Sequence, residues 1–126
     1  MKRLVTAIVF ILIGTALAVG GYFSLRTICR DMNNSLYNVI SFAQNEDKDK
    51  ALSAVKEAKE NWDKKNSLLG VYTNHSEMDE LQILMKTLER LAEDENYEEL
   101  IDDCYECIYN FEHIGETETP SFGNIF

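Results

Sequence analysis

The sequence is poor in residues that interrupt helices and in cysteine. It has one proline, six glycines and three cysteines among 126 residues. It also lacks runs of alternating Val, Ile or Thr bounded by turn residues, so no segment predicts a β-strand. The odd number of cysteines suggests no disulfide framework. These absences exclude a β-sheet protein and a disulfide-rich secreted miniprotein, and they predict an all-α chain with room for one small domain.

Charge is absent from the first part of the chain. No charged residue lies between Leu4 and Leu25, and every acidic residue lies at or after Asp31. A helix needs about 20 residues to cross a hydrocarbon core of about 30 Å. Lys2 and Arg26 flank the run, where basic groups reach lipid head groups. We therefore expect residues 4–25 to cross the lipid bilayer as an uncleaved anchor of a single-pass protein.

A cleaved signal peptide is the alternative to an anchor. Ala16-Leu17-Ala18 supplies a small-x-small cleavage site, and cleavage behind Ala18 would leave a secreted, soluble helical protein. The apolar run continues to Leu25, which favours the anchor. Basic residues are nearly balanced across the run. We expect the amino terminus on the cytoplasmic side of the cell membrane and the helical domain on the opposite, extracytoplasmic side.

The remaining chain is strongly acidic. Residues 31–126 carry 22 acidic and 8 basic side chains, a net charge of −14. This charge argues against nucleic-acid binding. No serine or cysteine lies in a hydrolase motif, and no twelve-residue EF-hand loop occurs. We expect neither an enzyme nor a cofactor, and no small-molecule substrate is evident.

Apolar periodicity predicts four helical segments. The first continues from the anchor to about residue 44, and the others cover about residues 48–67, 74–92 and 96–113. Residues 68–73 form a predicted apolar connector, and Ser76 and Asp79 have the spacing of a capping box. We therefore divide the chain into an anchor (1–25), an acidic helical bundle (26–114) and a tail (115–126).

The chain also contains an internal sequence repeat. A shift of 49 residues places the turn residues 45–47 on 94–96 and the apolar residues of the first two helices on those of the last two. Trp62, which we expect to anchor the core, falls on Phe111 in this alignment, and we expect a structural or interaction role for Phe111. Two equivalent helical hairpins would stack into one antiparallel bundle. Chance similarity between two amphipathic hairpins is the alternative explanation.

Cys104 and Cys107 have the CxxC spacing of metal and redox sites. His113 follows six residues later, and His75 could supply a fourth ligand. Both cysteines fall in the middle of a predicted helix on its apolar stripe, where free cysteine packs as a small hydrophobic residue. We expect packing, and we keep a metal or redox site as the alternative.

The fourth helix has an apolar face wider than a small bundle buries, which indicates a partner. We expect this partner to be another membrane protein or a second copy of the chain. The tail ends in Asn124, Ile125 and Phe126, and this apolar end would fold onto the bundle or dock on another protein. The face comprises Tyr97, Leu100, Ile101, Cys104, Tyr105, Cys107, Ile108 and Phe111.

The order of these features resembles a known family. An N-terminal anchor precedes a helix with Trp62, then the run from Asn74 through His75 to Asp79, and finally Asn124-Ile125-Phe126. It is similar to the domain-of-unknown-function family 4363, small singly anchored membrane proteins of spore-forming Gram-positive bacteria. The resemblance implies an anchored helical domain without an assigned activity that works beside a larger membrane protein.

Overall fold

The computed structural model describes residues 1–117, with all their side chains except those of Tyr72, Glu116 and Thr117. Four helices make up this part of the chain, and none of the described residues forms a strand. The prediction of an all-α protein is confirmed. The helices are α1 (Lys2–Gln44), α2 (Lys48–Tyr72), α3 (His75–Glu93) and α4 (Tyr97–Thr117).

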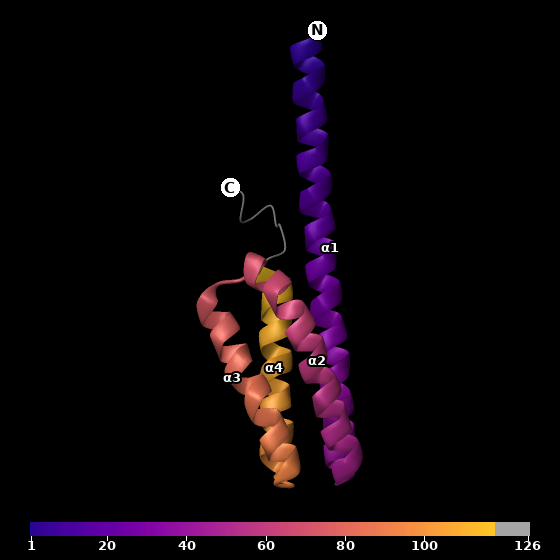
Figure 1. Ribbon diagram of the computed structural model, residues 1–126, viewed down its shortest axis with the longest axis vertical. Helices are drawn as coiled ribbons and strands as arrows, with labels where there is room; N and C mark the ends of the chain where they lie inside the picture. Colours follow the sequence, from indigo (N-terminus) through magenta and orange to yellow (C-terminus); the bar gives the residue numbers. More distant parts are fainter. Residues whose placement is uncertain (118–126) are drawn as a thin grey trace.

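The helices form an antiparallel bundle from which α1 projects. Helix α1 is 43 residues long, and its N-terminal part extends alone beyond the bundle (Figure 1). Its C-terminal part packs on α2 and α4, while α3 packs on α2 and α4. Each helix thus contacts its neighbour in the chain, and α4 closes the ring against α1. This is the packing expected of two stacked helical hairpins.

The core contains the apolar stripes predicted from the sequence. The first buried residue of α1 is Leu25, and the residues before it are exposed apart from the half-buried Gly21 and Tyr22. Among the described residues no polar or charged residue is buried as a whole, although single polar atoms are. The largest fully buried side chains include Trp62, Phe111, Met32, Leu36, Leu69, Leu81, Met85, Leu88, Leu100 and Ile114.

The turns inside the two hairpins have the same geometry. Glu46 and Glu95, which are 49 residues apart, both adopt the left-handed conformation, with φ of 54° and 56°. The Glu46 N–H donates to the carbonyl of Ala43 at 3.0 Å, and the Glu95 N–H donates to that of Ala92 at 3.3 Å. Each turn therefore ends its helix with a glutamate in the position that glycine usually takes.

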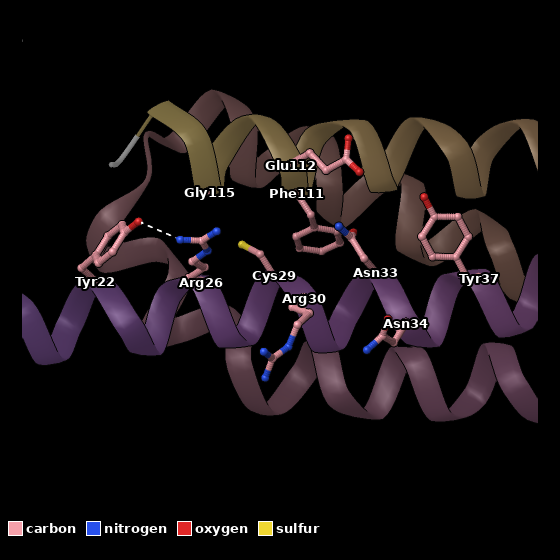
Figure 2. Close-up of a pocket in the computed structure, with 10 residues that line it drawn as sticks. All are labelled: Tyr22, Arg26, Cys29, Arg30, Asn33, Asn34, Tyr37, Phe111, Glu112 and Gly115. Carbon is pink, nitrogen blue, oxygen red and sulfur yellow. Dashed lines mark hydrogen bonds between the residues drawn. The ribbon is translucent and has the colours of Figure 1, made fainter. Parts of the chain in front are cut away.

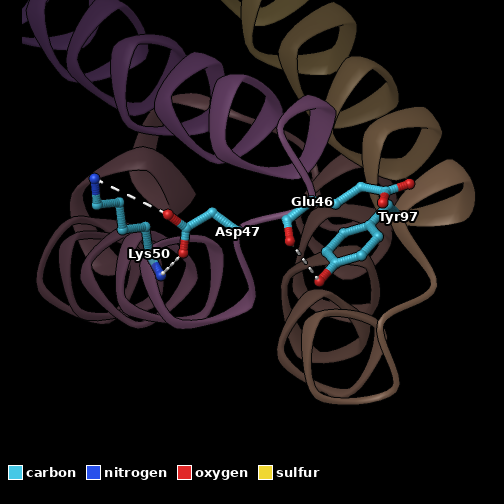
Figure 3. Close-up of polar contacts among 4 residues, drawn as sticks. All are labelled: Glu46, Asp47, Lys50 and Tyr97. Carbon is cyan, nitrogen blue, oxygen red and sulfur yellow. Dashed lines mark hydrogen bonds and ion pairs between the residues drawn. The ribbon is translucent and has the colours of Figure 1, made fainter.

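The residues that follow these turns also correspond. Asp47 accepts from the Lys50 N–H at 3.2 Å and caps α2 (Figure 3). Asn96, its counterpart, accepts from the Glu99 N–H at 3.4 Å. Both side chains satisfy N–H groups that have no partner inside the helix. The internal repeat thus corresponds to two hairpins of equivalent local structure, α1–α2 and α3–α4.

Three predicted boundaries were wrong. The apolar connector at residues 68–73 is instead helical through Tyr72, because the fully buried Leu69 keeps this turn packed on the core. The Ser76–Asp79 capping box does not form, since Asn74 caps α3 by accepting from the Glu77 N–H at 2.9 Å. Helix α4 continues past residue 113 to Thr117, where burial of Ile114 holds its last turns.

Candidate functional site

Trp62 lies in the centre of the bundle together with its repeat counterpart. The edge of one ring meets the other, with Trp62 and Phe111 centroids 5.9 Å apart and an interplanar angle of 67°. The Trp62 Nε1–H donates to Gln82 Oε1 at 2.7 Å, so its polar atom is satisfied across the α2–α3 interface. Both aromatic residues predicted as structural therefore contribute to the core.

His75 and Asp79 lie on the surface at the start of α3. Both side chains are exposed, and His75 is the first helical residue after the Asn74 cap. The cap is made by Asn74 and Glu77, so His75 takes no part in that hydrogen bond. Asn124, Ile125 and Phe126 lie outside the described residues.

The four candidate metal or redox residues occupy different surroundings. Cys104 and Cys107 are fully buried, and burial raises the pKa of Cys104 to about 12 and that of Cys107 further. His113 lies on the surface with its Nδ1 3.3 Å from Glu77 Oε1. Within residues 1–117, no group of three or more His, Cys, Asp or Glu side chains is placed to hold a metal ion. The two thiols stay protonated at neutral pH, which makes them poor nucleophiles.

Most of the wide apolar face of α4 is buried in the bundle. Of this face Tyr105 remains on the outside, next to Tyr109, and these two residues have 48% and 66% of their surfaces exposed. They lie one turn apart on the same side of the helix. The buried part comprises Leu100, Cys104, Cys107, Ile108 and Phe111.

An open cavity of about 530 Å³ lies between α1 and α4 and was not predicted from the sequence (Figure 2). Its size falls in the range of about 300–1,000 Å³ typical of ligand pockets. Polar and charged side chains from both helices surround an apolar floor. The lining residues are Tyr22, Arg26, Cys29, Arg30, Asn33, Asn34, Tyr37, Phe111, Glu112 and Gly115.

The cavity coincides with places where the two hairpins differ in side-chain size. The 49-residue shift pairs Cys29 with Met78 and Phe111 with Trp62. The α1–α4 interface therefore has the smaller residue at both positions, whereas the equivalent α2–α3 interface has the larger. The smaller side chains at these two positions leave space that Trp62 and Met78 occupy in the other interface.

The same shift explains an unpaired polar atom. Asn33 corresponds to Gln82, which accepts a hydrogen bond from Trp62. Phe111 has no N–H to donate, and the buried Oδ1 of Asn33 has no hydrogen-bond partner among the described residues. Figure 2 shows the Asn33 amide beside the Phe111 ring. A buried acceptor without a partner is costly, which makes it a position where a bound donor would be stabilising.

Charged groups of both signs flank this cavity. Arg26 Nη1 donates to the Tyr22 hydroxyl at 3.3 Å, and its guanidinium extends toward α4 (Figure 2). The described residues place no carboxylate within ion-pair distance of Arg26, whereas Arg30 Nε lies 4.0 Å from Asp31. Glu112 lines the α4 side. The cavity therefore offers a cation on one helix and an anion on the other.

Comparison with known proteins assigns the chain to a family. The sequence model of the family described as Domain of unknown function (DUF4363) matches residues 19–125. The chain belongs to this family. The resemblance noted from Trp62, the Asn74–Asp79 run and the terminal residues is thereby confirmed. No curated protein and no solved structure matches the chain.

Proposed function

We propose that this protein is a single-pass membrane protein whose bundle is a non-catalytic interaction or accessory module of a membrane complex. The bundle stands at the surface of the cell membrane, outside the cytoplasm. Helix α1 serves both as the bilayer span and as one of the four bundle helices. The partner is another membrane protein or a second copy of the chain.

The observation that carries this proposal is the unbroken course of α1. It is the one described helix that is long and apolar enough to cross a membrane, and it continues into the bundle without interruption. Its first apolar residues have no partner in the bundle, and exposing so much apolar surface to water is costly. A bilayer supplies the apolar surroundings that this segment requires.

A surface for a partner is provided by Tyr105 and Tyr109. Both are exposed on the outer side of α4, at a spacing that lets them contact one surface together. Tyrosine is enriched at the centres of protein interfaces because its ring buries a large area and its hydroxyl still finds a hydrogen-bond partner. The absence of a hydrolase or EF-hand motif in the sequence fits an interaction role rather than catalysis.

A pull-down of the full-length protein from its own membranes in mild detergent tests this role. We expect mass spectrometry to identify a stoichiometric membrane partner, or an untagged copy of the chain to co-purify with a tagged one. The double variant Tyr105→Ser, Tyr109→Ser should lose this partner. Ile83→Ser is the matched control, since Ile83 is a similarly exposed large side chain on α3 and does not line the α1–α4 cavity. A chain that is recovered alone, or a partner that the double variant retains in full, contradicts the proposal.

A further inference from the structure

The cavity between α1 and α4 opens at the end of the bundle that faces the expected bilayer. Arg26 is the first charged residue after the uncharged run 4–25, so a helix that spans the bilayer with this run places Arg26 at the level of the lipid phosphates. Gly115, in the last turn of α4, lines the same cavity. The cavity therefore begins where the span ends.

Exposed apolar side chains mark the same end of the bundle. Leu68 and Val71, near the end of α2, have 43% and 75% of their surfaces exposed. Leu68 shares a shallow surface pocket with Phe23 and Ser24 of α1, which places the end of α2 level with the end of the uncharged run. Apolar residues at this level contact the interfacial region of a bilayer favourably. Lipid is thus the molecule that lies next to the cavity.

The charges around the cavity select the kind of head group. The Arg26 guanidinium fits a phosphate, with which arginine forms strong charge-assisted hydrogen bonds. Glu112 and the unpaired Oδ1 of Asn33 are acceptors, and they fit a donor that carries positive charge. The net charge of −14 on residues 31–126 disfavours a purely anionic lipid. A head group with a phosphate followed by an amine satisfies all three conditions.

We propose that the α1–α4 cavity binds the head group of an amine-bearing phospholipid such as phosphatidylethanolamine. Arg26 holds the phosphate, Glu112 and Asn33 accept hydrogen bonds from the ammonium group, and the Phe111 ring forms the apolar floor. The inference rests on the proposed function, because a chain that is not anchored would not hold its cavity at a bilayer. Bound lipid would fill the space that Trp62 and Met78 fill in the equivalent interface.

The test uses the full-length protein in vesicles of phosphatidylethanolamine, phosphatidylglycerol and phosphatidylcholine in equal amounts. Flotation first establishes whether the protein is anchored. The protein is then transferred to mild detergent, and native mass spectrometry measures the lipid that it retains. We expect wild-type protein to retain phosphatidylethanolamine in preference to the other two lipids. Arg26→Gln should lower this retention about tenfold, the loss expected for one charge-assisted hydrogen bond.

Three further variants complete the test. Glu112→Gln should weaken the preference for phosphatidylethanolamine over phosphatidylcholine, since a neutral amide accepts weaker hydrogen bonds than a carboxylate from the ammonium N–H groups, which phosphatidylcholine lacks. Phe111→Trp should close the cavity and abolish retention while its circular dichroism spectrum remains that of a folded helical protein. Arg90→Gln, which changes an exposed arginine near the end of α3, should retain lipid as the wild type does.

Several outcomes overturn the inference. These are equal retention of the three lipids, a preference for phosphatidylglycerol, no retained lipid, or undiminished retention by a folded Phe111→Trp variant. Protein that floats with the vesicles but shows one of these results contradicts the head-group site alone. Protein that fails to float contradicts the proposed anchoring as well.

Discussion

The two hairpins of this bundle have the same turn but pack differently against each other. Helices α1–α2 and α3–α4 both end their first helix with a left-handed glutamate and cap the next helix with an Asp or Asn side chain. Across the α2–α3 interface Trp62 donates a hydrogen bond to Gln82. Across the equivalent α1–α4 interface Phe111 lies beside Asn33, whose Oδ1 has no hydrogen-bond partner among the described residues. The shared pattern determines the architecture, and the departures from it create the cavity.

The largest expected effect comes from truncating the two central aromatic residues. Trp62→Ala should lower the free energy of unfolding by about 3–5 kcal/mol, because it leaves a cavity and an unpaired Gln82. Phe111→Ala should cost about 3 kcal/mol, the lower end of that range, because Phe111 makes no side-chain hydrogen bond and already borders open space. Denaturant unfolding of the full-length protein in detergent micelles, followed by circular dichroism, measures both. A larger loss for Phe111→Ala would contradict the asymmetry.

The next largest effect is expected from two exchanges, each of which makes one interface resemble the other. Trp62→Phe removes the indole N–H and leaves the Gln82 Oε1 without a hydrogen-bond donor, which is the state of Asn33 Oδ1 in the wild type. This exchange should lower the free energy of unfolding by about 1–3 kcal/mol. Phe111→Trp supplies a donor next to Asn33 and should cost less than about 1 kcal/mol. The same unfolding measurement compares them. If the two exchanges cost the same, the two interfaces do not differ in the way proposed.

A smaller effect tests the equivalence of the two turns. Glycine adopts the left-handed conformation at no steric cost, so Glu46→Gly and Glu95→Gly should each raise the free energy of unfolding by about 0.5–1 kcal/mol. Glu57→Gly is the control, since Glu57 is exposed inside α2 and its replacement should destabilise the helix by about 1 kcal/mol. Destabilisation by either turn substitution would argue against the turn geometry.

The last two effects are small and depend on pH, and the first of them concerns Asp103, which the 49-residue shift pairs with the buried Ala54. Partial burial, and then the nearby Glu99, raise the pKa of Asp103. The stability that its neutral form contributes is full below the ordinary aspartate pKa and is lost as pH rises through the raised value. Asp103→Asn should therefore be more stable than wild type by about 0.5 kcal/mol at pH 7, with no difference at acidic pH.

Glu89 provides the opposite pH dependence. The hydrogen bond from Lys59, whose Nζ lies 2.8 Å from Glu89 Oε2, and the lysine charge lower the pKa of Glu89. Its stabilisation is present above the ordinary glutamate pKa and is lost as pH falls through the lowered value. Glu89→Gln should cost about 0.2–1 kcal/mol at pH 7, and the difference should close in acid. Parallel pH profiles for the two variants would contradict these assignments.

The sequence was sufficient to predict most of the fold. Apolar periodicity and the two acidic turns predicted four helices, and the single Trp62 was correctly predicted to lie in the core. The errors occurred at helix ends, where local patterns compete with tertiary packing. Residues 68–72 looked like a connector because of Gly70, yet burial of Leu69 keeps them helical. Ser76 and Asp79 had the right spacing for a cap, but Asn74 precedes them and makes it.

The cavity was not predicted because it depends on contacts between helices. No local pattern in α1 distinguishes Arg26 or Asn33 from other polar residues that follow an apolar run. The signal that could have found the cavity is the internal repeat, since it pairs Asn33 with Gln82 and Cys29 with Met78. To infer a cavity from those pairs, one must also know that α1 packs on α4 in the way that α3 packs on α2.

The central claim is that one continuous helix is both the membrane span and a bundle helix. Its most direct test is the intact mass of the native protein that remains in membranes after an alkaline carbonate wash. We predict that the chain stays in the membrane and retains residues 1–18, which precede the candidate cleavage site. A chain that is released by the wash, or one that begins at Val19, would contradict the claim.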